Sequence, residues 1–143
     1  MTPQSGALND LYRELILEHY KRPRNYGPLP EATAQSQGHN PSCGDRVGVM
    51  LRLEGQRVVA AHFTGSGCAI STASASMMTE LVQGKTREEA LELARAFKAM
   101  VVDGTPPSPQ LGQLSALAGV HQLPARVKCA TLAWNALEQA LAQ

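Results

Sequence analysis

The stretch that decides the fold is VGVMLRLEGQRVVAAHFT, residues 47–64. In its first half, apolar residues stand at every second position from Val47 to Leu53, which is the period of a strand with one buried face. The segment EGQR contains a glycine and predicts a turn, and the run VVAAHFT after it predicts a second strand. We therefore expect these residues to form an antiparallel hairpin.

The segments on either side of this hairpin carry cysteines. The turn NPSCGD before the first strand holds Cys43 and Asp45, and the second strand leads through TGSG into Cys68. Because an antiparallel hairpin brings its two outer ends together, we expect Cys43 and Cys68 to lie in one neighbourhood.

The rest of the chain is predominantly helical by the spacing of its apolar residues. Asn9 is a suitable N-cap for the first helix, Thr86 and Glu89 form a capping box for the third, and Pro124 suits the first turn of the last. A short edge strand is expected before the hairpin, over residues 32–37. The predicted helices cover residues 9–22, 68–84, 86–101, 111–117 and 123–142.

The composition indicates one domain, residues 1–143, that binds proteins or small ligands. Of its 143 residues, 43% are hydrophobic and 17% charged, and the formal net charge is +1, so neither nucleic acid nor an anionic membrane surface is an expected partner. No stretch approaches the roughly 20 apolar residues that cross a bilayer, and the first thirty residues do not resemble a signal peptide. We expect a cytoplasmic protein.

Three cysteines, Cys43, Cys68 and Cys129, are an odd number in such a protein and do not indicate a disulfide framework. Cys68 and Cys129 lie near expected helix starts, where the helix dipole favours the thiolate, the form that attacks electrophiles and binds metals. The three cysteines and Asp45 together make four anionic ligands, the number that a tetrahedral zinc site needs. His39 and His62 are reserve ligands. Two simpler interpretations stay open: cysteines that fill core volume, and an aspartate that only caps its turn.

Four motifs together give a resemblance to a known family. They are LYRELILEHYKRPRNYG (residues 11–27), HNPSCGDRV (39–47), GSGCAISTASASMM (65–78) and RVKCATLAW (126–134). In this order, they resemble the NifU-N/IscU/SufU family of iron–sulfur cluster assembly proteins over nearly the whole chain. The SufU branch is the most similar, because Lys128 stands where IscU-type proteins have a histidine, and because the segment between Cys68 and Cys129 is longer.

The resemblance implies an α+β fold, with helices packed on a three-stranded antiparallel sheet. It implies that Cys43, Cys68 and Cys129 are the family's three essential cysteines and that Asp45 is its motif aspartate. The expected cofactor is Zn²⁺, with iron or a transient [2Fe-2S] cluster as the other possibility. The expected partners are a SufS-like cysteine desulfurase, other Suf components and apo iron–sulfur proteins.

The leading hypothesis is that Cys43, Asp45, Cys68 and Cys129 hold zinc, and that the protein accepts persulfide sulfur from a desulfurase. Cys129 is the expected acceptor because Arg126 and Lys128 lie beside it at a helix start. This would make the protein at most a zinc-dependent sulfurtransferase. Three alternatives remain: a [2Fe-2S] scaffold, a zinc-stabilised interaction module without transfer chemistry, and a hydrolase in which Cys68 attacks and His39 or His62 is the base.

Overall fold

A three-stranded antiparallel sheet forms one layer of the protein in the computed structural model, which describes residues 3–42 and 44–143. Its strands, in spatial order, are β1 (Ala34–Asn40), β2 (Asp45–Glu54) and β3 (Arg57–Ser66). The expected hairpin is β2–β3, in which Met50 pairs with His62 and Glu54 with Arg57 next to the turn. The hairpin and the α+β fold are therefore confirmed.

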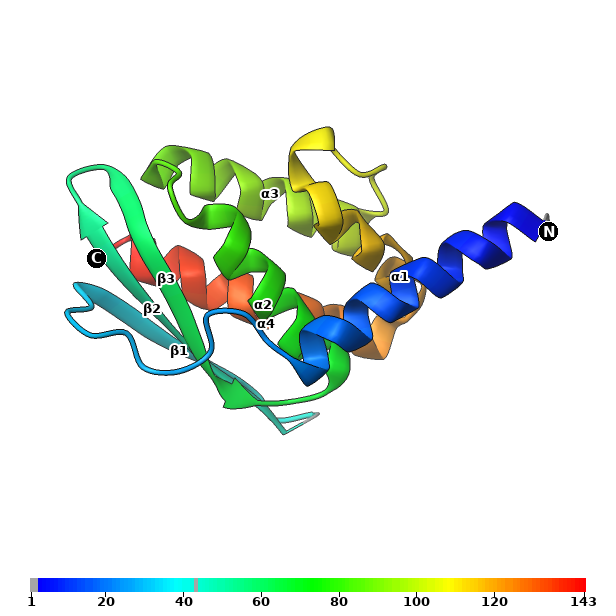
Figure 1. The fold of residues 1–143 in the computed structure, drawn as a ribbon, viewed down its shortest axis with the longest axis horizontal. Helices are drawn as coiled ribbons and strands as arrows, with labels where there is room; N and C mark the ends of the chain where they lie inside the picture. The colour runs from blue at the N-terminus through cyan, green and yellow to red at the C-terminus, as the bar shows by residue number, and fades with distance from the viewer. Residues whose placement is uncertain (1–2, 43) are drawn as a thin grey trace.

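The helices pack on one face of this sheet (Figure 1). They are α1 (Pro3–Lys21), α2 (Ala69–Val82), α3 (Arg87–Asp103), the 3₁₀ segment η1 (Pro109–Gln122) and α4 (Pro124–Leu141). On the sheet, Val47, Val49 and Leu51 face the helices and are buried, as the period-two pattern predicts. None of the helices within the described residues is long and apolar enough to cross a membrane.

Strand β1 differs from its expected position, because it starts at Ala34 and continues to Asn40 instead of covering residues 32–37. Its sequence AQSQGHN shows no apolar alternation, so its bounds come from pairing with β2 along its whole length, from Ala34 opposite Leu51 to Asn40 opposite Asp45. Gly38 lies against α4, where a Cβ atom would come within 2.9 Å of Leu132 Cδ1. The strand therefore depends on tertiary contacts more than on its own propensity.

The first helix also differs from the prediction, because it begins at Pro3 and Asn9 lies inside it. The prediction that Asn9 is the N-cap of this helix is therefore wrong. Proline is well tolerated in the first helical turn, and an N-cap residue type does not stop a helix that has started upstream. The segment η1 is longer than the expected 111–117, and it bends at Gly112, whose φ of 54° is non-helical.

The centre of the helical layer is held by an aromatic stack and a buried hydrogen-bond network. The rings of Phe97 and Trp134 stack with centroids 5.0 Å apart. Trp134 Nε1 donates to Ser74 Oγ at 3.1 Å, and Ser74 Oγ donates to the carbonyl of Ala130 at 2.7 Å. This network joins α2 to α4 next to Cys129, so the two helices have a defined position relative to one another there.

Candidate metal centre

Asp45, Cys68 and Cys129 meet at the end of the sheet opposite the β2–β3 turn. Each offers one ligand atom, and these atoms all lie within 4.8 Å of one another. Asp45 is the first residue of β2, Cys68 is the N-cap of α2, and Cys129 lies in the second turn of α4. Three elements far apart in the sequence therefore bring a carboxylate and two thiols together.

Cys68 is held by its position at the start of α2. As the N-cap it has an extended backbone, with φ −71° and ψ 172°, and its sulfur accepts a hydrogen bond from the backbone N–H of Ser71 at 3.5 Å. Free N–H groups at a helix start stabilise negative charge on a group that lies next to them. The predicted helix-start position of Cys68 is thus confirmed.

Asp45 reaches Cys68 through both carboxylate oxygens. Oδ1 accepts a hydrogen bond from the Cys68 backbone N–H at 3.1 Å, and Oδ2 lies 3.8 Å from Cys68 Sγ. Only 1% of Asp45 is exposed. The approach requires Gly67, because a Cβ atom there would lie 2.9 Å from Asp45 Oδ1. Asp45 therefore does more than cap its own turn.

Cys129 is fully buried beside the last residue of β1. Its sulfur lies 3.9 Å from Asn40 Nδ2, and it donates to the carbonyl of Ala125, one turn earlier in α4, also at 3.9 Å. Its placement in the second turn agrees with the expected position near the helix start. The flanking Lys128 and Arg126 are exposed.

The histidines expected as reserve ligands lie elsewhere, on the outer face of the sheet. His39 is exposed, and its strand neighbours Gly38 and Asn40 point toward the helices. His62 accompanies it on that face, and its Nδ1 lies 3.3 Å from the carbonyl oxygen of Pro28. Within the described part of the chain, the metal-ligand cluster holds no histidine, and the hydrogen bonds of Cys68 go to Asp45 and Ser71. A Cys68–histidine hydrolase site has no support from this geometry.

The donor set fits a zinc ion. Ligand atoms on a tetrahedral zinc, at bond lengths of about 2.0–2.3 Å, are about 3.3–3.8 Å apart, and the three atoms found here lie within 4.8 Å of one another. Small side-chain movements would therefore suffice for binding. The fourth expected ligand, Cys43, lies outside the described residues, between Ser42 and Gly44.

Three residues that shape the centre were not anticipated from the sequence: Asn40, Gly67 and Ser71. Asn40 and Gly67 stand within the motifs NPSCGD and GSGC, and Ser71 is three residues after Cys68. The spacing of an N-cap to its third helical residue could have indicated Ser71. The contacts of Asn40 and Gly67 follow from strand register and from a turn, which the sequence pattern does not reveal.

Two similar proteins cover almost the whole chain. The "Zinc-dependent sulfurtransferase SufU" of Bacillus subtilis (strain 168) is 46% identical over 140 residues, which are 97% of this chain and 95% of that protein. The "Iron-sulfur cluster assembly scaffold protein IscU" of Streptococcus pyogenes serotype M1 is 45% identical over 137 residues, 95% of this chain and 86% of that protein.

One solved structure has a fold similar to that of this chain. It is a putative iron–sulfur cluster assembly scaffold protein for the SUF system from Fervidobacterium islandicum AW-1, with a TM-score of 0.85 and 37% sequence identity, covering 90% of this chain and 94% of that chain. The NifU-like N terminal domain matches residues 11–143. With the resemblance of its motifs confirmed in this way, the chain belongs to the NifU-like N-terminal domain family.

Proposed function

We propose that this protein is a SufU/IscU-type iron–sulfur cluster assembly protein that binds zinc through Cys43, Asp45, Cys68 and Cys129 and accepts sulfur from a cysteine desulfurase. The observation that carries the proposal is the convergence of Asp45, Cys68 and Cys129 within 4.8 Å. Support also comes from the 46% identity to a protein named a zinc-dependent sulfurtransferase.

Each ligand residue has a separate part in the proposed centre. Zinc, when bound, supplies a redox-inert centre that keeps thiols deprotonated at neutral pH and lets its ligands exchange. Asp45 contributes an oxygen and remains tied to the backbone N–H of Cys68. Cys68 contributes a sulfur at the N-terminus of α2, where it accepts a hydrogen bond from the backbone N–H of Ser71. Cys129 is the exchangeable ligand and the acceptor of sulfur.

The sulfur-transfer step needs no further reactant. The Cys129 thiolate attacks the terminal sulfur of the persulfide on the desulfurase cysteine, an S–S bond forms on Cys129, and the desulfurase cysteine leaves as a thiolate. Charge and electrons balance, since one S–S bond is exchanged for another. The desulfurase recovers its reduced cysteine, and this protein carries the persulfide onward to cluster assembly.

A surface hollow beside Cys129 gives the desulfurase a path of approach. It has a volume of about 420 Å³ and is lined by Asn40, Ser42, Pro124, Ala125 and Lys128. Asn40 and Ala125 are also the residues that contact the Cys129 sulfur. Lys128 carries a positive charge at this hollow, which favours the approach of an anionic persulfide. Ordinary solvation of a helix start would also account for an exposed lysine there, so Lys128 supports the proposal only as part of this arrangement.

The test is transfer of persulfide from a purified cysteine desulfurase to zinc-loaded protein, compared between wild type, Cys129→Ser and Cys68→Ser. The wild type is expected to stimulate desulfurase turnover and to gain one sulfur on Cys129, detected by mass spectrometry. Cys129→Ser should give no stimulation. Cys68→Ser should bind zinc more weakly but still gain sulfur on Cys129.

Two outcomes would contradict the proposed role of Cys129. In one, Cys129→Ser stimulates the desulfurase as well as the wild type does. In the other, the sulfur is found on a different cysteine. If the wild type itself binds zinc but gives no stimulation, the protein is a zinc-stabilised interaction module instead.

A [2Fe-2S] scaffold is the second candidate, and the 45% identity to a protein named an IscU scaffold favours it. In this role the iron and sulfide are cargo, passed on to apo iron–sulfur proteins, and the same thiolates hold them. Metal analysis and an absorption spectrum of protein purified without oxygen separate the two roles. Visible sulfide-to-iron bands indicate a scaffold, and a colourless protein with one zinc indicates sulfur transfer.

A further inference from the structure

Asn40 and Asp45 form the last residue pair of the β1–β2 ladder. Both point toward the helices and are buried, with exposed fractions of 6% and 1%. From this shared position they reach different helices. Asp45 bonds to Cys68 at the start of α2, and Asn40 lies against Cys129 in α4. The end of the hairpin thus contacts both described cysteines.

The orientation of the Asn40 amide follows from its second contact. Asn40 Oδ1 accepts a hydrogen bond from the backbone N–H of Ser42 at 3.2 Å. With the oxygen assigned to a backbone donor, the NH₂ group must point the other way, and there Nδ2 lies 3.9 Å from Cys129 Sγ. Within the described residues, this sulfur is the acceptor that the Asn40 amide reaches.

We propose that Asn40 is a positioning residue of the metal centre, which donates an N–H to the Cys129 sulfur and so orients that thiolate toward the cation. This inference rests on the proposed zinc site. Asn40 itself is not a ligand, because its oxygen is used by Ser42 and an amide nitrogen has no free lone pair for a metal.

The effect of this hydrogen bond on the centre is electrostatic as well as geometric. A hydrogen bond from a neutral donor is strengthened when the sulfur carries the negative charge of a metal-bound thiolate. It also spreads the charge of the sulfur, and an uncompensated buried anion would destabilise the site. Partners of metal ligands of this kind typically change metal affinity by roughly 10–100-fold when they are removed.

The contact pairs Asn40 with the proposed acceptor of sulfur and not with Cys68, which has its own donor in the backbone N–H of Ser71. Any residue at position 71 except proline keeps this backbone donor, whereas the donor that Asn40 offers to Cys129 is a side chain. A single substitution can therefore remove the hydrogen-bond donor of Asn40 to the Cys129 sulfur, but hardly the backbone donor to the Cys68 sulfur.

The test compares zinc affinity, measured by competition with a chelator, in wild type, Asn40→Asp and Asn40→Ala. Asn40→Asp keeps the shape and the oxygen that accepts from Ser42, but replaces the donor with a charged oxygen. Both variants are expected to bind zinc roughly 10–100-fold more weakly. The matched control is Asn25→Asp, because Asn25 Nδ2 donates to Thr79 Oγ1 at 3.1 Å, away from the cysteines. Asn25→Asp should bind zinc as the wild type does.

A spectroscopic readout separates positioning from a purely structural role. In cobalt-substituted protein, loss of the N–H donor raises the energy of the sulfur electrons, so the sulfur-to-cobalt charge-transfer bands should move to longer wavelength in Asn40→Ala. A merely structural effect would reduce the amount of bound cobalt without moving the bands. If Asn40→Asp does not fold, Asn40→Ala alone decides the question by affinity and band position.

The outcomes distinguish this inference from the proposed function. Wild type that binds neither zinc nor cobalt would overturn the metal centre itself. Wild type that binds both, with Asn40→Ala unchanged in affinity and band position, would overturn only the role of Asn40.

Discussion

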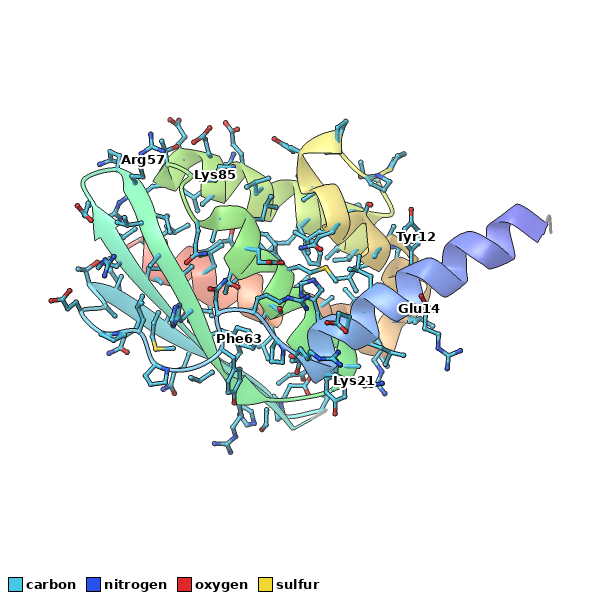
Figure 2. All side chains as sticks on the ribbon, in the orientation of Figure 1. Tyr12, Glu14, Lys21, Arg57, Phe63 and Lys85 are labelled. Carbon is cyan, nitrogen blue, oxygen red and sulfur yellow. The ribbon has the colours of Figure 1, made fainter. Side chains whose placement is uncertain are left out.

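The two ends of the sheet are joined to helices in different ways. At the β2–β3 turn, where Arg57 and Lys85 lie (Figure 2), most of the links are made by the backbone, and the Arg57 side chain adds a hydrogen bond to the carbonyl of Gly84. The N–H of Val58 donates to the carbonyl of Lys85 at 2.8 Å, and its carbonyl accepts from Gly84 at 2.7 Å. The N–H of Arg87 donates to the carbonyl of Gln56, also at 2.7 Å.

At the opposite end, side chains make the links. Asp45 bonds to the N–H of Cys68, and Asn40 contacts the sulfur of Cys129. Backbone hydrogen bonds form with almost any sequence, whereas these contacts need particular residue types. A buried carboxylate beside two buried or half-buried thiols is costly without a compensating charge. The turn end is therefore held by hydrogen bonds within the chain, while the cysteine end gathers three ligand atoms that could hold a cation.

Removal of zinc should have the largest effect, and its local effect should be greatest at the cysteine end. At free zinc concentrations 100–1,000 times the dissociation constant, bound zinc stabilises the fold by about 3–4 kcal/mol, provided that the unfolded chain binds it weakly. Urea unfolding with zinc and with a chelator measures this difference. Hydrogen exchange should accelerate more at the start of β2 and of α2, through local opening, than where Val58 meets Lys85, where it should follow only the loss of global stability. Equal acceleration at both ends would break the comparison.

Thr86→Ala should weaken the turn end by about 1 kcal/mol and leave zinc affinity unchanged. Thr86 is the N-cap of α3, and it exchanges side-chain and backbone hydrogen bonds with Glu89 in a capping box. The matched control is Ser108→Ala, since Ser108 is the N-cap of η1 but makes no side-chain cap hydrogen bond. Urea unfolding of the metal-free proteins should show a loss for Thr86→Ala alone. A change in zinc affinity in Thr86→Ala would show that the two ends are coupled.

A smaller effect on the free energy of unfolding is expected from pH. It comes from His19, which lies at neither of these two ends. Burial lowers the pKa of His19 below its ordinary value of 6.5, with the positive charge of Arg24 acting in the same direction and the hydrogen bond to Gln113 against it. The unfolded chain therefore takes up a proton first as the pH falls. The free energy of unfolding should decrease as the pH drops below about 6.5 and level off below the lowered pKa of the folded state.

His19→Gln provides the comparison for this pH dependence. The ring of His19 contacts Ser76 Oγ at 2.7 Å and Gln113 Oε1 at 3.2 Å, so it joins α1 to α2 and η1. Urea unfolding of metal-free wild type and variant between pH 5 and pH 7.5 measures the difference. The same pH slope in both proteins would refute the assignment to His19.

Much of the fold was predictable because local patterns agree with the tertiary structure. The β2–β3 hairpin follows from period-two alternation, and the start of α3 from its capping box. Strand β1 was only partly predictable, since its polar sequence is placed by pairing with β2. The start of α1 was misplaced because the apolar spacing begins well after Pro3.

The candidate site was predictable to different degrees. Hairpin geometry indicated that the segments carrying Cys43 and Cys68 would meet. Cys43 lies outside the described residues, but Asp45, from the same turn, does contact Cys68. Cys129 is far from both in the sequence, so only its chemistry and the resemblance to a family placed it with them. Asn40 was missed because asparagine before a proline is typical of a turn. Its contact with Cys129 depends on the register of β1 against β2 and on the position of α4.

The most direct test of the metal centre is X-ray absorption at the zinc edge of the zinc-loaded protein. We expect three sulfurs at about 2.3 Å and one oxygen at about 2.0–2.2 Å to coordinate the zinc. In Asp45→Ala the oxygen should be replaced by solvent or lost while the three sulfurs remain. Coordination by fewer than three sulfurs, or by histidine nitrogens in their place, would contradict the convergence of the three cysteines on one cation.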